Sequence, residues 1–182
     1  MDPRTFLPGA PTTPATVPAV GEPARELPVE LDGRPTVVVF LRHVGCPFAE
    51  ATFRAAHELA AADPGTRWIA VSHGSREATA EWCEAVSGGA GVVELVVDPD
   101  RAAYAAWGLG RTSLGHFLGR RSLGEVVRLS RQGIRNRHPS GTRWQSAGTF
   151  GVDAAGTIRS VHVPRHAGDL PDLQAAAAAT RR

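Results

Sequence analysis

The sequence has no lysine, one methionine, one tyrosine and only two cysteines, Cys46 and Cys83. Two cysteines in 182 residues exclude a disulfide scaffold, and a chain of this length can bury a full hydrophobic core without one. No apolar run approaches the roughly 18 residues of a membrane-spanning helix. All 20 basic residues are arginine and the net charge is only +2, which we attribute to genome composition.

The N-terminal segment differs in composition from the rest of the chain. It lacks the basic-then-apolar layout of a signal peptide, so we expect a cytoplasmic protein. Proline at high density removes backbone donors and blocks helices and central strands. We therefore predict a disordered arm over residues 1–28 and one folded domain over residues 29–182. Within the arm lie seven prolines: Pro3, Pro8, Pro11, Pro14, Pro18, Pro23 and Pro28.

Hydrophobic patterning beyond the arm predicts alternating strands and helices. Turn and cap signals delimit the elements, such as Asp63-Pro64-Gly65 and Gly88-Gly89. This alternation, followed by a hairpin and a helix, indicates an α/β sandwich with a mixed sheet: parallel strands and an antiparallel C-terminal hairpin, flanked by helices. The predicted strands are 37–41, 68–72, 92–97, 149–152 and 158–163, and the predicted helices are 48–62, 75–87, 101–107, a weaker one near 123–129, and 171–180.

Cys46 stands where a buried strand passes into a helix, in the stretch VVVFLRHVGCPFAE. A helix N-terminus stabilises a thiolate, which is the nucleophilic form of cysteine, and Pro47 suits the first helical position. Arg42 and His43 lie on the approach and can add positive charge or a base. The pattern favours a reactive cysteine over a small residue that merely packs at the joint.

Four segments resemble, in order, the peroxiredoxin-like (AhpC/TSA-related) branch of the thioredoxin superfamily: VVVFLRHVGCPF, VSHGSREATAEW, VVDPDRAAYAAWGLGR and GTFGVDAAGTIRSVHVPRHAGDLPDL. The resemblance covers roughly residues 28–180. It implies a thioredoxin-like fold with Cys46 at the start of the first major helix, and a redox-active antioxidant protein.

The chain departs from this family at three positions of the peroxidatic motif. Where the family has PxxxTxxC, this chain has Val39 and His43 in place of the proline and threonine, and the family's arginine before the TF strand is Ala147. The second cysteine of a thioredoxin CxxC motif is also absent, because residue 49 is alanine. Cys46 therefore cannot form a disulfide within its own turn.

Cys83 has two open interpretations. Its place on the helix after VS resembles the bacterial thiol peroxidase subgroup, which implies a possible resolving cysteine for Cys46. Its stripe with Thr79 and Val86, beside Trp82, is instead typical of a buried structural cysteine. A disulfide would require Cα atoms within roughly 7 Å or local unwinding of the helix.

An arginine-rich segment between residues 111 and 143 can bind an anion or can simply be a solvated surface. No aromatic platform or reader motif accompanies it, so we do not expect nucleic-acid binding. Arg111, Gln145 and Thr149 are further candidates for substrate binding. No ligand spacing suggests a metal site, and we expect no cofactor. The arginines of the 111–143 segment are Arg111, Arg120, Arg121, Arg128, Arg131, Arg135, Arg137 and Arg143.

The leading hypothesis is a thiol-dependent oxidoreductase in which Cys46 attacks a peroxide or disulfide, supported by His43 and Arg42. Cys83 or an external thiol, such as that of thioredoxin, would complete the cycle. One alternative is a repurposed biosynthetic enzyme acting on a small anionic metabolite. Another is a non-catalytic binding module, because the fold alone does not decide function. We also expect no membrane contact and consider a homodimer possible.

Overall fold

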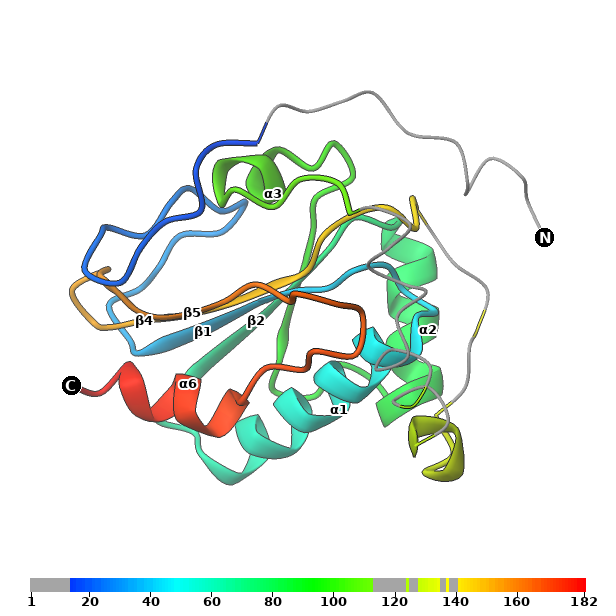
Figure 1. Cartoon of the computed structure of the whole chain (residues 1–182). Coiled ribbons are helices and arrows are strands. Elements are labelled where there is room, and N and C mark those ends of the chain that lie inside the picture. The colour runs from blue at the N-terminus through cyan, green and yellow to red at the C-terminus, as the bar shows by residue number, and fades with distance from the viewer. Residues whose placement is uncertain (1–13, 113–123, 125–127, 135–136, 138–140) are drawn as a thin grey trace.

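A five-stranded mixed sheet forms the centre of the molecule in the order β3-β2-β1-β4-β5 (Figure 1). The structure is a computed structural model that describes residues 14–112, 124, 128–134, 137 and 141–182. β1 pairs in parallel with β2, and β2 with β3, while β4 runs antiparallel to both β1 and β5. This arrangement confirms the predicted α/β class. The strands are β1 Thr36–Phe40, β2 Arg67–Ser72, β3 Glu94–Val97, β4 Gly148–Val152 and β5 Ile158–His162.

Helices cover the two faces of the sheet unequally. Alternate residues of β1 point to opposite faces, so Val37 and Val39 pack with the helices α1, α2 and α6, while Val38 and Phe40 pack with α3. The bounds agree closely with the predicted ones, and residues 128–131 are helical, overlapping the end of the weaker prediction and continuing two residues past it. The helices are α1 Pro47–Ala62, α2 Arg76–Ser87, α3 Ala102–Ala106 and α6 Leu173–Ala179. No helix in the described ranges is long and apolar enough to cross a membrane.

Aromatic packing on the α3 face fixes the end of β1. The Phe40 ring lies 5.0 Å from Tyr104 and 5.5 Å from Trp107, measured between centroids, and 5.9 Å from Phe150 of β4. Edge-to-face rings of this kind add stability beyond the area they bury. The strand that leads to Cys46 therefore ends in a rigid part of the core.

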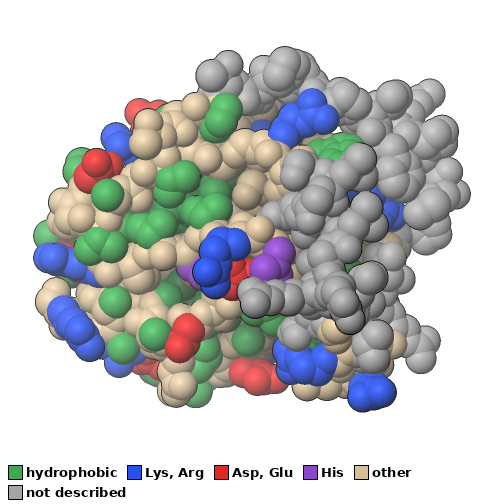
Figure 2. Space-filling view, viewed as in Figure 1, with side chains coloured by type: hydrophobic (Ala, Val, Ile, Leu, Met, Phe, Trp, Pro, Cys, Tyr) green, Lys and Arg blue, Asp and Glu red, His purple; other side chains and the backbone are tan. Residues whose placement is uncertain are grey.

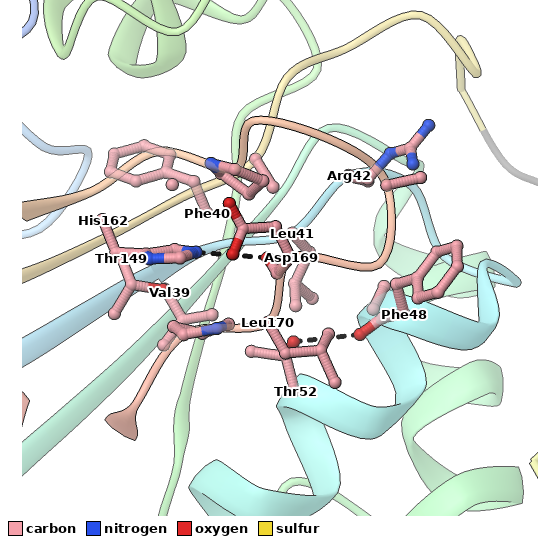
Figure 3. A pocket seen from close by; sticks show the side chains of 16 residues that line it. Val39, Phe40, Leu41, Arg42, Phe48, Thr52, Thr149, His162, Asp169 and Leu170 are labelled. Atoms are coloured by element: carbon pink, nitrogen blue, oxygen red, sulfur yellow. Dashed lines mark hydrogen bonds between the residues drawn. The ribbon is translucent and has the colours of Figure 1, made fainter. Parts of the chain in front are cut away.

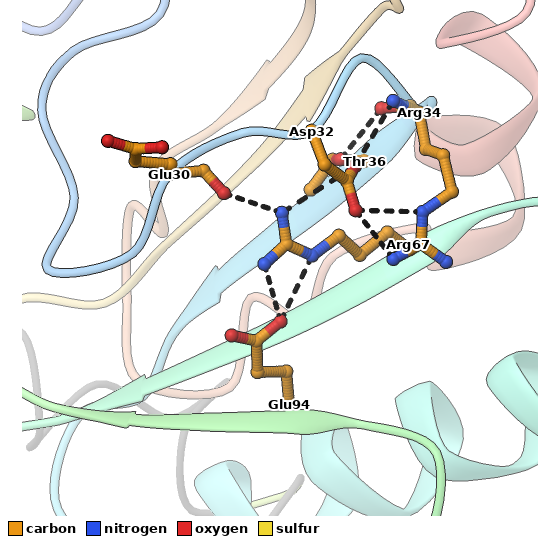
Figure 4. Close-up of polar contacts among 6 residues, drawn as sticks. All are labelled: Glu30, Asp32, Arg34, Thr36, Arg67 and Glu94. Carbon is orange, nitrogen blue, oxygen red and sulfur yellow. Dashed lines mark hydrogen bonds and ion pairs between the residues drawn. The ribbon is translucent and has the colours of Figure 1, made fainter.

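An ion-pair network holds the opposite end of the sheet (Figure 4). Arg67, at the start of β2, contacts the Glu94 carboxylate at 2.6 Å and the Glu30 carbonyl at 2.7 Å. Asp32 lies 2.7 Å from Arg34 and 3.7 Å from Arg67. The network joins the chain entering β1 to the amino ends of β2 and β3. Cys46 follows the opposite, carboxyl end of β1.

Residues 14–28, which the sequence predicts to be part of a disordered arm, are packed in the structure. These residues lie along the α3 face, where Val17, Ala24 and Leu27 pack against the sheet core. A five-residue helix covers little of that face, so apolar residues of an irregular segment can bury themselves there. Residues 1–13 lie outside the described residues. The hydrogen bonds that hold residues 14–28 against the rest of the molecule are Ala15 N to Ala105 O, Gly21 N to Ile158 O, Ala24 N to Gly156 O, Ile158 N to Glu22 O, and Trp107 Nε1 to Glu26 O.

Two glycines provide the space for this segment. Gly108 has φ +76°, and a Cβ there would collide with the backbone of Val17. A Cβ on Gly110 would meet the ring of Pro14.

The surface view shows hydrophobic side chains gathered over the part of the sheet where β4 and β5 lie, beside the packed segment (Figure 2).

We predict that removing residues 1–26 lowers the melting temperature by about 5 °C or more. Lost hydrogen bonds and apolar contacts cost about 2 kcal/mol or more, and each kcal/mol shifts Tm by about 2–4 °C at this chain length. Calorimetry of the truncated chain measures this directly. A variant lacking only residues 1–13 is the control, since it keeps every contact described above. Equal melting of the wild type and the longer truncation would contradict the packed segment.

Candidate functional site

Cys46 is the N-cap residue of α1, in extended backbone geometry at φ −78° and ψ 131°. Its carbonyl accepts from Glu50 N at 2.9 Å, and Pro47 occupies the first helical turn. Gly45, at φ +91°, allows the chain to turn sharply just before the cysteine. The side chain is only 4% exposed. The sulfur is thus held at the positive end of a sixteen-residue helix and largely away from water.

Two basic side chains precede the thiol and are themselves buried. Arg42 and His43 are each 3% exposed. The guanidinium of Arg42 donates to the Arg143 carbonyl at 3.4 Å, and burial lowers its pKa, an effect that the Cys46 charge opposes. Nδ1 of His43 lies 2.9 Å from the Val44 carbonyl. Because a carbonyl only accepts, Nδ1 carries a proton there, and Nε2 is the basic nitrogen of the neutral ring.

The surroundings of Cys46 favour its anion. Burial raises the pKa of the thiol, but hydrogen bonding and electrostatic attraction from His43, then the charge of Arg42, outweigh it. The N–H of Ala49 adds a smaller stabilisation. Together they lower the pKa from 9.0 to about 6. A pKa of about 6 favours the thiolate near neutral pH, and the reactivity of Cys46 remains a prediction.

A buried acid beside the cysteine turn is a feature that sequence reasoning missed. Glu50 is fully buried in the first turn of α1, with Arg54 at 2.8 Å and Arg137 at 3.2 Å. The backbone N–H of Arg137 also donates to the Gly45 carbonyl at 2.9 Å. One residue of the arginine-rich segment thus fastens the turn before Cys46 to α1. In the sequence, the only indication of these ion pairs was an acidic residue, Glu50, four positions after Cys46.

A pocket of about 360 Å³, including its mouth, lies between the end of β1, the start of α1 and β4 (Figure 3). Its walls are mostly apolar, and among the described residues that line it Arg42 is the one arginine. Figure 3 shows the guanidinium of Arg42 directed away from the other labelled side chains, and the His162 ring directed toward Asp169. The lining includes Val39, Leu41, Arg42, Phe48, Ala49, Thr52, Ala147, Thr149, His162, Asp169 and Leu170.

The structure separates the residues proposed for substrate binding. Thr149 is buried and lines the pocket. The side-chain amide of Gln145 instead donates to the carbonyls of Leu109 and Gly110, at 2.7 and 3.2 Å. Arg111 forms an isolated backbone bridge with Gln145 and is exposed outside the pocket lining. Gln145 therefore fastens two loops together, and substrate binding by it and by Arg111 remains a prediction.

Cys83 lies in the hydrophobic core on α2, at 1% exposure. Burial raises the pKa of its thiol to about 12, so it is protonated at any physiological pH. Its carbonyl accepts from Ser87 Oγ at 2.9 Å and from Gly89 N at 3.3 Å at the end of the helix. Both cysteines are free thiols. Resolution of Cys46 by Cys83 remains a prediction.

Solved structures share this architecture at low sequence identity. A peroxiredoxin-like protein from Aquifex aeolicus matches with TM-score 0.63 and 14% identity, over 94% of this chain and 91% of that one. A thiol peroxidase from Chromobacterium violaceum matches with TM-score 0.59 and 16% identity, over 91% and 87%. Peroxiredoxin 5 from Alvinella pompejana matches with TM-score 0.53 and 12% identity, over 93% and 100%. These likenesses show that the chain has a thioredoxin-like fold.

The family itself is shown by sequence. A family model described as "AhpC/TSA antioxidant enzyme" matches residues 54–166, and the chain belongs to that family. The matched range begins eight residues after Cys46, so the family assignment does not depend on the cysteine. No curated protein matches the chain.

We predict that Cys46 titrates near pH 6 and that His43→Ala raises its pKa more than Arg42→Ala does, because His43 contributes both a hydrogen bond and an electrostatic attraction. Iodoacetamide labelling against pH reports the thiolate, with Cys83→Ser as the common background so that one thiol remains. Each variant should move the inflection upward. An inflection at the free-thiol value of about 8.5 in the parent would refute the assignment.

Proposed function

We propose that the protein is a thiol-dependent peroxidase in which Cys46 reduces a peroxide that carries an apolar group. The observation that supports this most is the lowered pKa of Cys46 at the start of α1. A thiolate is the nucleophile in this chemistry, and here His43, Arg42 and the N–H of Ala49 favour it. The family and its solved structural neighbours support the same class of reaction.

The reaction balances with the groups present and an external thiol. Nε2 of His43 takes the thiol proton, and the Cys46 thiolate attacks one peroxide oxygen. An S–O bond forms while the O–O bond breaks, which gives a sulfenic acid and an alkoxide. The alkoxide takes the proton held by His43 and leaves as the alcohol. One external thiol then displaces water from the sulfenic acid, and a second thiol releases Cys46 as a thiol and leaves with the first as a disulfide.

The apolar lining of the pocket supports a substrate that carries a hydrocarbon group. The resemblance places the family's motif proline and arginine at Val39 and Ala147, and both of these residues line the pocket. The methyl group of Ala147 is much smaller than the arginine side chain that the family has at this position. The neighbouring walls, including Phe48 and Leu170, are apolar. An organic hydroperoxide can therefore place its hydrocarbon part there and its peroxide group toward the start of α1.

An external thiol, rather than Cys83, completes the proposed cycle. A thiol with a pKa raised to about 12 and 1% exposure is a poor attacking group. We expect Cys83→Ser to keep peroxide turnover with a small-molecule thiol, while Cys46→Ser loses it. Consumption of cumene hydroperoxide measures turnover, and intact mass of the oxidised protein reports any disulfide. Loss of turnover in Cys83→Ser, or a wild-type mass lower by two hydrogens, would establish Cys83 as the resolving cysteine instead.

We predict that Ala147→Arg lowers the preference for cumene hydroperoxide over hydrogen peroxide by about tenfold, because the new side chain fills the pocket. The ratio of the two kcat/KM values is the readout. Ala154→Arg is the matched control, since it adds the same charge at an exposed turn. An unchanged ratio in Ala147→Arg would exclude this pocket as the binding site, while the assignment of Cys46 would stand.

A further inference from the structure

A second buried histidine lies beneath the cysteine turn. His73 follows β2 directly and is 5% exposed. Because β1 and β2 are parallel, their carboxyl ends meet at the same edge of the sheet, and His73 lies beside the chain that continues from Phe40 toward Cys46. His73 is absent from the lining of the pocket, so its role is not contact with the substrate placed there.

Nε2 of His73 makes a close hydrogen bond with the Arg42 carbonyl. A carbonyl oxygen only accepts, so Nε2 carries the proton and donates it. Burial lowers the pKa of His73 to about 4, although the bond to Arg42 opposes this and the charges of His43 and Arg101 add to it. The ring is therefore neutral near neutral pH and acts as an uncharged donor.

The position of the ring is enclosed from two sides. It packs edge-on against Tyr104, with 5.5 Å between ring centroids. On another side lies Gly141, at φ +81°, where an added Cβ would collide with Nδ1 of His73. Because these contacts hold the His73 ring in place, its hydrogen bond can fix the position of the Arg42 carbonyl.

The carbonyl before Arg42 is held from the same side. The Tyr104 hydroxyl lies 2.6 Å from the Leu41 carbonyl and 2.8 Å from the Val71 carbonyl of β2. The Leu41 N–H donates to that same Val71 carbonyl at 2.9 Å. Two successive carbonyls after β1, those of Leu41 and Arg42, are thus contacted by buried side chains from outside β1.

The Arg42 carbonyl belongs to the peptide that joins Arg42 to His43. The orientation of this peptide sets the directions in which both side chains leave the backbone, and both lower the pKa of Cys46. A hydrogen bond closes the turn from His43 to Cys46, in which Cys46 N donates to the His43 carbonyl at 3.2 Å. We propose that His73 is a positioning residue that, through the Arg42 carbonyl, holds Arg42 and His43 where they stabilise the Cys46 thiolate. This inference rests on the proposed thiolate function of Cys46.

The test compares His73→Leu, which keeps much of the bulk but has no donor, with His73→Gln, whose amide can donate from a similar position. Both are made in the Cys83→Ser background, and the pKa of Cys46 is read from iodoacetamide labelling. We expect His73→Leu to raise the pKa by about one unit, which is about a tenfold loss of thiolate at pH values well below it. His73→Gln should restore most of the shift.

Tyr104→Phe separates positioning from general stability. It removes the buried hydroxyl from the Leu41 and Val71 carbonyls but leaves the Arg42 peptide bonded, so Tm should fall with a smaller change in the Cys46 pKa. An unchanged pKa in His73→Leu, or equal shifts in the Leu and Gln variants, would overturn the inference. If the parent itself titrates as a free thiol, the proposed function fails first, and the positioning role fails with it.

Discussion

A negative charge held almost out of water is the constraint on which the rest of the site depends. Cys46 is 4% exposed, and burial alone would keep its thiol protonated. The anion becomes favourable only because His43 and Arg42 are close and the first turn of α1 presents its N–H groups. Those two basic groups are buried as well, so their positions must be fixed by packing and backbone contacts rather than by solvent.

The sheet supplies this rigidity through its connectivity. Parallel β1 and β2 end at the same edge, where Tyr104 and His73 contact the chain leaving β1. Across the turn, Arg137 joins the Gly45 carbonyl to the buried Glu50 of α1. The ion pairs around Arg67 lie at the other end of the strands. The ion pairs around Arg67 and the reactive site are therefore at opposite ends of the strands.

Much of the fold follows from local patterns in the sequence. β-Branched runs predict β1 and β2, and the Ser75 cap with Gly88 delimits α2 almost to the residue. The proximity of His43 and Arg42 to Cys46 was also predictable, because the three residues are neighbours in one turn. The packed course of residues 14–28 was not, since it depends on how little of one sheet face the five-residue α3 covers.

The two contacts near the site that the sequence did not predict, His73 with Arg42 and Arg137 with Glu50, were missed for one physical reason. His73 meets Arg42 across 31 positions of the chain, and Arg137 meets Glu50 across 87. No periodicity or spacing reports such contacts, which exist only once the strands pair and the helices pack. A weaker signal was present for His73, because polar residues that follow neighbouring parallel strands collect at one edge of a sheet.

The pH dependence of sulfenic acid formation tests the central claim most directly. In the Cys83→Ser background, the second-order rate constant of Cys46 with an organic hydroperoxide is measured by stopped flow at a series of pH values. A thiolate with a pKa of about 6 predicts a rate that rises through pH 6 and is level above pH 7. A rate that continues to rise through pH 8 to 9, as for a free thiol with a pKa of about 8.5, would contradict the account.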